Sequence, residues 1–315
     1  MKKIDDKKIS VVIPVYDNSA SLNELSGRLL KVFEQEQYDY EILFVDDGSK
    51  DLSGKVLKDL ASKQEKIKVI FLSRNFGQHP AICAGFEKAK GEIIILMDAD
   101  LQDNPEDIPQ LVDKLRESAV DVVYTVKKTT KEKILTRTTS AIFHYIFSKI
   151  VKTNIFLNIG TFRAFNKKFL HSLLQYKEVN ILYGPLMMYM GYSSCYIELP
   201  YTSRKHGKSS YTFFKRLKLA VDSLISYTNI PHKISVLLGA ILLVTGSIYA
   251  IVIVLQYMFN DTSLPGGTTL IILVLLIMLG SLMLTLGIIG SYVFRVYQEV
   301  LSRPRYLIKE KINIE

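Results

Sequence analysis

The chain has 315 residues, enough for one large domain or two smaller ones. Its 40 Lys and Arg residues against 31 Asp and Glu give a net charge of +9, which favours anionic partners such as phosphates, lipid headgroups or nucleic acid. The two cysteines, Cys83 and Cys195, have neither metal-ligand nor disulfide spacing. Composition therefore excludes a cysteine-based framework and indicates a reducing compartment.

Strand-like and helix-like segments alternate over the first 125 or so residues. The strand-like runs are ISVVIPV (9–15), YEILFV (40–45), IKVIFL (67–72), EIIILM (92–97) and VDVVY (120–124). The helix-like segments lie near 20–36, 51–64, 77–90 and 105–117. This alternation predicts an α/β fold with a parallel-rich sheet covered on both faces. Ligands of such sheets bind beyond the carboxyl ends of the strands.

The second strand ends in VDDGS, so Asp46 and Asp47 follow directly on apolar residues. A carboxylate there can accept hydrogen bonds from a nucleobase N–H or from ribose hydroxyls. The alternative is a plain turn, because Asp-Gly pairs form turns and Asp51 could cap the next helix.

The fourth strand ends in ILMDADLQD, with acids directly behind a run of aliphatic residues. Asp98 and Asp100 are two residues apart, so on a strand they share one face. With the side-chain oxygen of Gln102 they form an all-oxygen set that suits Mg²⁺ or Mn²⁺ bridging a diphosphate. A helix cap at Asn104, with Pro105 in the first turn, explains the following residues but not the acid pair.

The last quarter of the chain contains two long uncharged stretches. No charged residue lies between Lys233 and Asp261, or between Asp261 and Arg295. Each stretch exceeds the roughly 20 apolar residues that cross a bilayer, and neither has the polar face expected of a buried helix in a water-soluble core. Basic residues flank the pair of stretches but are missing from the connector 260–268. The sequence therefore predicts two transmembrane helices with both ends in the cytoplasm.

Five segments together carry a resemblance to a known family. They are VVIPVYDN, VDDGS, LSRNFGQHPAICAGFEKAKG, MDADLQDNPE and RKHGKSSY, in this order and ahead of the two uncharged stretches. The chain resembles family 2 glycosyltransferases, and among them the bactoprenol (polyprenyl-phosphate) glycosyltransferases, relatives of dolichol-phosphate mannose synthase. The resemblance implies a GT-A fold, a nucleotide-sugar donor with UDP favoured, a divalent metal (Mg²⁺ or Mn²⁺) and inverting transfer onto a polyprenyl phosphate. It also implies a multi-pass protein of the cell membrane with a cytoplasmic catalytic domain, and leaves room for a homo-oligomer.

Site residues follow from the same resemblance. The nucleotide-sugar set is Pro14, Tyr16, Asp46, Asp47, Asp98, Ala99 and Lys127. The metal ligands are Asp98, Asp100 and Gln102. The acceptor or phosphate set is Arg163, Arg204, Lys205 and Lys208, and the catalytic set is Asp98, Asp100 and Arg204. A solvated loop is the alternative for the basic cluster at 204–208.

The chain departs from the family pattern at three places. Asp17-Asn18 stands where relatives often have Asn-Glu, which leaves any role for that acid open. Ser210 replaces the final Lys of the Arg-x-x-Gly-x-Ser-Lys motif, although Lys208 is close by. Thr161 replaces an Asp that many bacterial relatives carry. A sugar hydroxyl acceptor needs a general base, whereas a lipid phosphate is already anionic, so the change at 161 favours a lipid phosphate acceptor.

The middle of the chain predicts amphipathic helices. Apolar residues recur at helical spacing in 141–151, and 211–225 adds basic residues to such a pattern directly before the first uncharged stretch. A basic amphipathic helix at that place is expected to lie in the headgroup layer. The expected organisation is a catalytic domain with its juxtamembrane helices over 1–230, a transmembrane hairpin over 231–296 and a basic cytoplasmic tail over 297–315.

Other functional classes fit less of the sequence. A processive polysaccharide synthase shares the catalytic domain but has a Gln-x-x-Arg-Trp motif and more spans, and this chain has no Trp. A non-catalytic membrane scaffold has no need of the acid pair at 98 and 100. A nucleic-acid binder fits the charge but not the spans, so no nucleic acid partner is expected. A glycosyltransferase acting on a glycan or on another lipid stays open as an alternative.

Overall fold

The computed structural model describes residues 8–127, 159–178, 181–199 and 267–314, together with the single positions 237, 241, 244, 248, 251 and 255. The chain divides into two units. The first comprises Met1–Ser210 with Pro304–Glu315, and the second comprises Tyr211–Arg303.

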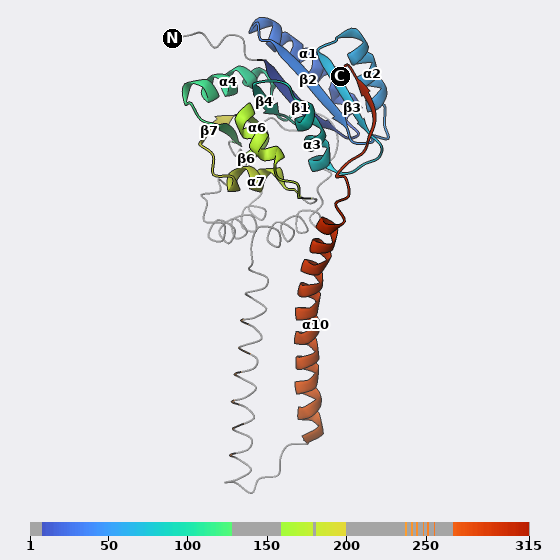
Figure 1. Cartoon of the computed structure of the whole chain (residues 1–315), viewed down its shortest axis with the longest axis vertical. Coiled ribbons are helices and arrows are strands. Elements are labelled where there is room, and N and C mark those ends of the chain that lie inside the picture. The colour runs from blue at the N-terminus through green and yellow to red at the C-terminus, as the bar shows by residue number, and fades with distance from the viewer. Residues whose placement is uncertain are drawn as a thin grey trace. The chain divides into compact units, whose positions relative to one another are not determined.

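An eight-stranded mixed sheet forms the centre of the first unit (Figure 1), with strand order β7-β5-β6-β4-β1-β2-β3-β8. The strands are β1 (Ile9–Val15), β2 (Tyr40–Asp46), β3 (Ile67–Leu72), β4 (Ile93–Leu96), β5 (Val122–Lys127), β6 (Ile159–Asn166), β7 (Ser194–Leu199) and β8 (Ile308–Ile312). Among these described strands only β6 and β8 run against the others. The predicted α/β fold with a parallel-rich sheet is confirmed, and its mixed, mostly parallel order is GT-A-like.

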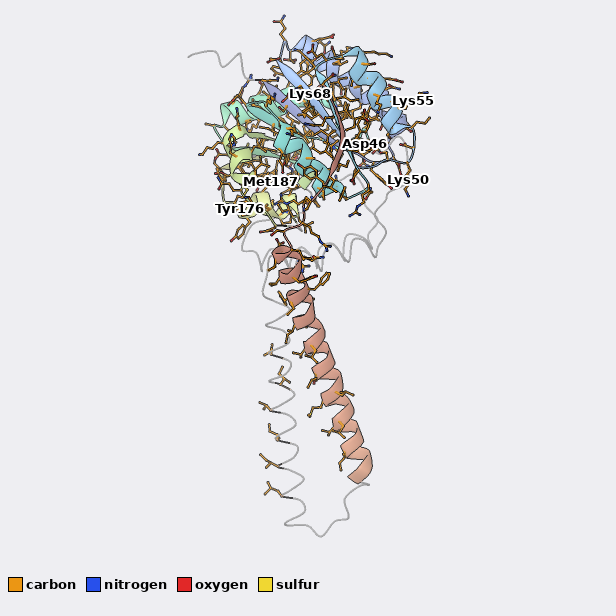
Figure 2. All side chains as sticks on the ribbon, turned by 45° about the vertical axis from the view of Figure 1, so that its right-hand side comes forward. Asp46, Lys50, Lys55, Lys68, Tyr176 and Met187 are labelled. Atoms are coloured by element: carbon orange, nitrogen blue, oxygen red, sulfur yellow. The ribbon has the colours of Figure 1, made fainter. Side chains whose placement is uncertain are left out.

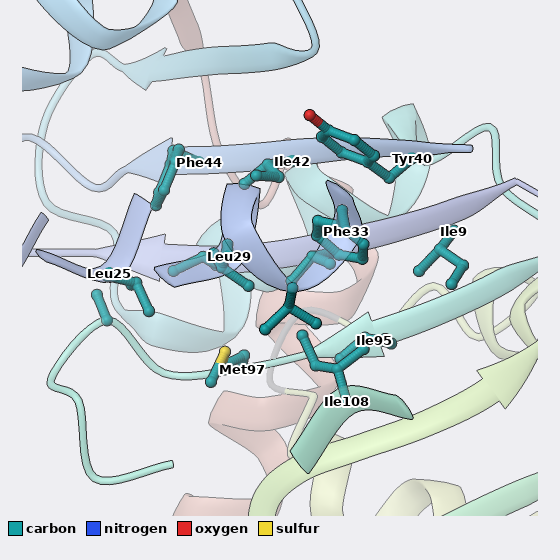
Figure 3. Packing of buried hydrophobic residues seen from close by; sticks show 14 of the residues in the cluster. Ile9, Leu25, Leu29, Phe33, Tyr40, Ile42, Phe44, Ile95, Met97 and Ile108 are labelled. Atoms are coloured by element: carbon teal, nitrogen blue, oxygen red, sulfur yellow. The ribbon is translucent and has the colours of Figure 1, made fainter. Parts of the chain in front are cut away.

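Helices cover both faces of this sheet. They are α1 (Ser19–Gln35), α2 (Ser53–Lys63), α3 (Gln78–Lys88), η1 (Pro105–Asp107), α4 (Ile108–Glu117), α6 (Lys167–Leu174) and α7 (Tyr183–Tyr189). Side chains alternate between the faces of each strand, so Val11 packs with α1, α2 and α4 whereas Val12 packs with α3, α6 and α7. Figure 3 shows the first of these layers, in which Leu25, Leu29 and Phe33 of α1 lie over Ile42 and Phe44.

The register brings the carboxyl ends of three central strands to one edge of the sheet. β1 pairs in parallel with both β2 and β4, and Val15 lies opposite Asp46. Lys68 lies near the start of β3, so Figure 2 shows it away from Asp46 and Lys50 at the other end of the strands. The acids predicted at the ends of β2 and β4 therefore lie at one edge, with β1 between them.

The end of the chain supplies the outermost strand next to β3. β8 pairs with it antiparallel, with Val69 opposite Ile312. Lys58 Nζ of α2 lies 2.7 Å from a carboxylate oxygen of Glu310, and Asn313 Nδ2 donates to Ala61 O (2.9 Å). Residues 297–315 are predicted to form a basic cytoplasmic tail, whereas residues 304–315 belong to the same compact unit as the sheet.

The second unit contains α10 (Gly267–Val300), a helix of 34 residues. Among the residues that the structure describes, no helix combines the length and the apolarity that crossing a bilayer requires. The structure thus gives no confirmation of the two predicted spans. The predicted amphipathic segments 141–151 and 211–225, and most of the first predicted span, lie outside the described residues.

Candidate functional site

Two loops at the carboxyl edge of the sheet are tied together by side chain to backbone hydrogen bonds. Asp17, at the end of β1, accepts at Oδ1 from Lys50 N (2.7 Å), and its own N–H donates to Ser49 Oγ (3.0 Å). Asp17 has a positive φ of 53°, and the neighbouring residue Tyr16 is 40% exposed. The acid at position 17, whose role the sequence leaves open, therefore joins the loop after β1 to the loop after β2.

Asp46 lies buried at the end of β2. Its Oδ1 accepts from Ser49 N, three residues further along the chain, at 3.1 Å. Burial raises its pKa, against the opposing hydrogen bonds from Ser49. Asp46 is thus hydrogen-bonded within the loop that follows β2, and its contact with a nucleotide stays a prediction.

Asp47 binds the loop that follows β3. Its Oδ1 accepts from Phe76 N (2.7 Å) and its Oδ2 from Gly77 N (2.8 Å), while its side chain is buried. Burial raises its pKa to about 6, although the two amide N–H groups act in the opposite direction. Gly48 follows with a φ of +66°, and a Cβ there would lie 2.6 Å from Arg74 C. Asp47 and Gly48 together hold the 74–77 loop against the end of β2, a contact that the sequence analysis does not predict.

The acid pair predicted at the end of β4 lies at the same edge. Asp98 Oδ1 accepts from Gln78 Nε2 at 2.9 Å, and Asp100 Oδ1 accepts from Gln102 N at 3.1 Å. Ala99 is buried between the acids, and its carbonyl accepts from Ser21 Oγ of α1 (2.6 Å). The two acids are half-buried, so the structure presents them at the surface of the edge rather than in the core.

These residues fit a divalent cation held jointly with a substrate phosphate. The donor set is two carboxylates and a carboxamide, all hard oxygen ligands, and Mg²⁺ in proteins often takes only one or two carboxylates and completes its shell with phosphates and water. Leu101, directly after Asp100, has a φ of 59°, and this reversal turns the chain back at the acids. No group of three or more His, Cys, Asp or Glu residues placed to hold a metal occurs in the described ranges. Two carboxylates and a carboxamide leave coordination positions that phosphate oxygens and water can fill.

Arg163, predicted to contact phosphate, is buried on β6 beside β4. It lies opposite Leu96 in the register and is only 5% exposed. Its Nε donates to Thr161 O (2.9 Å) and its Nη2 to Gly160 O (2.8 Å), while the guanidinium lies over the Tyr124 ring with 5.5 Å to the ring centroid. Burial lowers its pKa, while nearby Tyr124 and Asp98 raise it. In the described structure Arg163 thus braces its own strand and contributes positive charge behind Asp98.

Three further polar side chains surround this region, and the sequence analysis assigns none of them to the site. Gln78 is the donor to Asp98 already described. The His79 ring lies 5.8 Å from that of Tyr183, and burial lowers its pKa to about 4, so that its imidazole is neutral at pH 7. Tyr124 has its pKa raised to about 12 by burial. The one signal for the first two is their position in the SRNFGQH segment, directly after the loop that Asp47 holds.

The remaining predicted residues are placed in part or not at all. Pro14 lies in β1 opposite Val45, at the edge described above. Lys127 ends β5, where it pairs with Leu199 in the register. Arg204, Lys205 and Lys208 lie outside the described residues, so the basic cluster stays a prediction.

Comparison with known proteins gives matches that cover the strands and helices described above. The family model described as Glycosyl transferase family 2 matches residues 10–174, which span β1 to the last residue of α6. Glycosyltransferase YkcC of Bacillus subtilis is 34% identical over 307 residues, covering 97% of this chain and 94% of that protein. Undecaprenyl-phosphate 4-deoxy-4-formamido-L-arabinose transferase of Proteus mirabilis is 33% identical over 310 residues, covering 98% of this chain and 95% of that protein.

A solved structure shares the fold. Glucosyl-3-phosphoglycerate synthase from Mycobacterium tuberculosis, crystallised with Mn²⁺ and UDP-glucose, superimposes with a TM-score of 0.50 at 15% identity. The match covers 70% of this chain and 77% of that one. At this identity the likeness concerns the fold alone.

Proposed function

This chain belongs to glycosyltransferase family 2, and from that premise we propose that it transfers a sugar from a nucleotide-sugar donor, with UDP favoured, to a polyprenyl phosphate of the undecaprenyl type. The enzyme class rests on the family match over residues 10–174. The observation that carries the acceptor is the similarity, over 98% of the chain, to a relative named as an undecaprenyl-phosphate sugar transferase. Addition of the sugar to lipid would serve the modification of a cell-envelope glycan.

The edge formed by β1, β2 and β4 is the proposed donor site. Tyr16 exposes its ring there and Pro14 shapes the strand beneath, so a nucleobase can stack at this place. Asp46 lies below this edge, while Asp47 uses both carboxylate oxygens on the backbone of the neighbouring loop. A direct contact of Asp47 with the ribose would therefore have to share those oxygens.

Asp98, Asp100 and Gln102 are the residues that would hold Mg²⁺ or Mn²⁺ with the donor diphosphate. A bound divalent cation supplies neutralisation of the charge that develops on the leaving diphosphate. Arg163 contributes a fixed positive charge that interacts electrostatically with Asp98. These side chains would thereby orient the diphosphate so that it leaves the anomeric carbon on the side opposite the incoming nucleophile.

The nucleophile in this proposal is the lipid phosphate oxygen, which attacks the anomeric carbon and inverts its configuration. It is anionic at neutral pH and transfers no proton to the enzyme, so it needs no general base. Thr161 has no carboxylate to offer at its position on β6, and the neutral His79 is buried. Cations are needed instead to hold the phosphate, and Arg204, Lys205 and Lys208 are the proposed source.

We further propose that residues 231–296 anchor the enzyme in the cell membrane, with the catalytic unit and the C-terminus in the cytoplasm. Supporting this are the uncharged stretches between Lys233 and Asp261 and between Asp261 and Arg295. The exposed large side chains described on the first half of α10 are apolar: Ile271, Val274, Leu275, Met278, Leu279 and Leu282. An anchor of this kind would keep the enzyme at the membrane that contains the polyprenyl lipid.

The proposed reaction is tested by extracting lipid after incubation. Membranes containing the full-length protein are given undecaprenyl phosphate, Mn²⁺ and each of a panel of radiolabelled nucleotide sugars. We expect label in the organic phase for one donor, none with excess EDTA, and a loss of orders of magnitude for Asp100→Asn, because the carboxamide no longer provides an anionic ligand. Label that reaches only water-soluble acceptors, or undiminished lipid labelling in EDTA, would contradict the proposal.

The membrane arrangement is tested with single cysteines. Ser263→Cys lies in the connector and Ser302→Cys follows α10. In intact cells an impermeant maleimide should label the first and not the second. The opposite pattern would refute the proposed topology without bearing on the reaction.

A further inference from the structure

We propose that Gln78 is a positioning residue for Asp98, and that Asp47 acts on the metal site through it rather than by touching the nucleotide. The inference rests on the proposed function, since Asp98 is there a ligand of the divalent cation. Its parts are three contacts that lead from the end of β2, through the loop after β3, to the end of β4.

The first contact is the hydrogen bond from Gln78 to Asp98. Nε2 donates to Oδ1 at 2.9 Å across two neighbouring segments, the first residue of α3 and the end of β4. A carboxylate bonded through one oxygen is restrained in its rotation, so that the direction of the other oxygen is fixed. Partners of this kind behind metal ligands set ligand orientation and strengthen metal binding.

The second contact fixes the position of the backbone that directly precedes Gln78. Asp47 accepts from Phe76 N and Gly77 N, the two residues directly before Gln78, at 2.7 and 2.8 Å. Two charge-assisted bonds to successive amides hold both the position and the direction of this stretch of backbone. Gly48 closes the same contact, because its missing Cβ lets the backbone of Arg74 approach.

The third contact holds the helix that Gln78 begins. A Cβ on Gly85 of α3 would lie 2.3 Å from Val12 Cγ1 and 3.2 Å from Val45 Cγ2, so the helix lies directly on β1 and β2. α3 therefore has little freedom to slide along the sheet, and the side chain of Gln78 points to Asp98 from a fixed base. The hydrogen bonds to Asp47 and the packing of α3 on the sheet together hold Gln78 where its side chain bonds Asp98.

Manganese binding tests the inference separately from transfer. The full-length protein in detergent is titrated with Mn²⁺ in the presence of saturating UDP, and the free ion is followed by electron paramagnetic resonance. Gln78→Met keeps the length of the side chain and removes the amide donor, and we expect its Kd for Mn²⁺ to rise about 10- to 100-fold. Gln110→Met, the same exchange on the exposed face of α4, is the matched control and should bind as the wild type does.

Kinetics separate positioning from a general loss of structure. For Gln78→Met, transfer should fall at low Mn²⁺ and return to near the wild-type kcat at saturating Mn²⁺, because the ion then orders Asp98 by itself. A disordered site would stay impaired at every concentration, and such a result would overturn the inference. Unchanged Mn²⁺ affinity in Gln78→Met would overturn it too, while leaving the proposed transfer reaction intact. A wild-type protein that binds no Mn²⁺ with UDP would instead refute the metal-dependent function, and the inference with it.

A double-mutant cycle tests the role given to Asp47. Asp47→Asn cannot accept both amide N–H groups, so it should weaken Mn²⁺ binding, and Asp47→Asn combined with Gln78→Met should cost no more than Gln78→Met alone. Fully multiplicative losses would show that the two residues act independently. UDP binding measured without metal should be little changed by Asp47→Asn, and a large loss there would show a direct contact with the nucleotide.

Discussion

Replacement of Gly48 by alanine probes the contact between the loops after β2 and β3. Gly48 has a φ of +66°, where an L-residue other than glycine is strained. A Cβ added there would also lie 2.6 Å from Arg74 C, 2.7 Å from Asn75 N and 2.9 Å from Arg74 Cα. All three are backbone atoms, which cannot rotate away as the end of a side chain can, so the 74–77 loop must move.

The expected cost has two parts. The left-handed conformation costs alanine about 1–2 kcal/mol. Displacing well-packed backbone adds about 1–3 kcal/mol, as overpacking generally does. The free energy of unfolding of the catalytic unit should therefore fall by about 2–5 kcal/mol. At about 2–4 °C per kcal/mol for a domain of this size, its melting temperature should fall by roughly 4–20 °C.

A second glycine provides the control. Gly27 lies in the middle of α1, and a Cβ there would meet no atom within 4 Å. Gly27→Ala should be neutral or stabilising by about 0.5–1 kcal/mol, because alanine favours the helix. The measurement is thermal unfolding of both variants and the wild type, followed by near-ultraviolet circular dichroism of the tyrosines. If Gly48→Ala melts with the wild type or with Gly27→Ala, the two loops are not in the contact described here.

Three other variants test separate parts of the structure. Burial raises the pKa of Asp47 from 3.8 to about 6, so between these pH values the folded state binds more protons than the unfolded state. The contribution of Asp47 to the free energy of unfolding therefore falls as the pH rises from about 4 to 6. The difference in urea midpoint between wild type and Asp47→Asn should shrink over the same pH range. Arg305→Ala removes the bond to Tyr176 O (2.6 Å) and should destabilise the catalytic unit by about 1–3 kcal/mol, seen as faster proteolysis, whereas Arg303→Ala on an exposed side chain should not. Arg204→Lys keeps the charge but loses the two-pronged grip on phosphate, so kcat/KM for lipid phosphate should fall about tenfold or more, and wild-type kinetics would place the phosphate site elsewhere.

The local sequence pattern was sufficient to predict the alternating strands and helices of the first 125 or so residues. The run ISVVIPV coincides with β1 (Ile9–Val15), and IKVIFL with β3 (Ile67–Leu72), because strands buried on both faces read as continuous apolar runs. β6, β7 and β8 were not predicted. β8 reads IKEKI, and its three half-buried positions are Ile308, Glu310 and Ile312, so the apolar alternation typical of a strand is interrupted by a charged residue.

The candidate site contains some features that the local sequence predicts and others that depend on residues far away in the sequence. The end of β4 could be identified because acids behind aliphatic residues are unusual at any strand end, and Asp98 and Asp100 lie at the expected edge. The role of Asp47 could not, since its partners Phe76 and Gly77 are about 30 residues away and the contact exists only once β2 and β3 are paired. The phosphate role of Arg163 stays a prediction, and the contact of its guanidinium with the Tyr124 ring of the adjoining strand could not be predicted from the local sequence.

The position of β8 at the sheet edge has a consequence for the biogenesis of the enzyme. Its residues follow the whole second unit in the chain, so the outer edge of β3 stays without its partner strand until residues 211–303 have been synthesised. An edge with unpaired N–H and C=O groups invites pairing with other chains, and a nascent enzyme is exposed to that hazard for as long as the second unit takes to be made. A nonsense mutation that removed only the residues after Arg303 would leave the predicted acid pair, the donor edge and α10 untouched. It would nevertheless leave β3 permanently open, so such a truncated protein should be lost to aggregation or proteolysis rather than accumulate as an active enzyme.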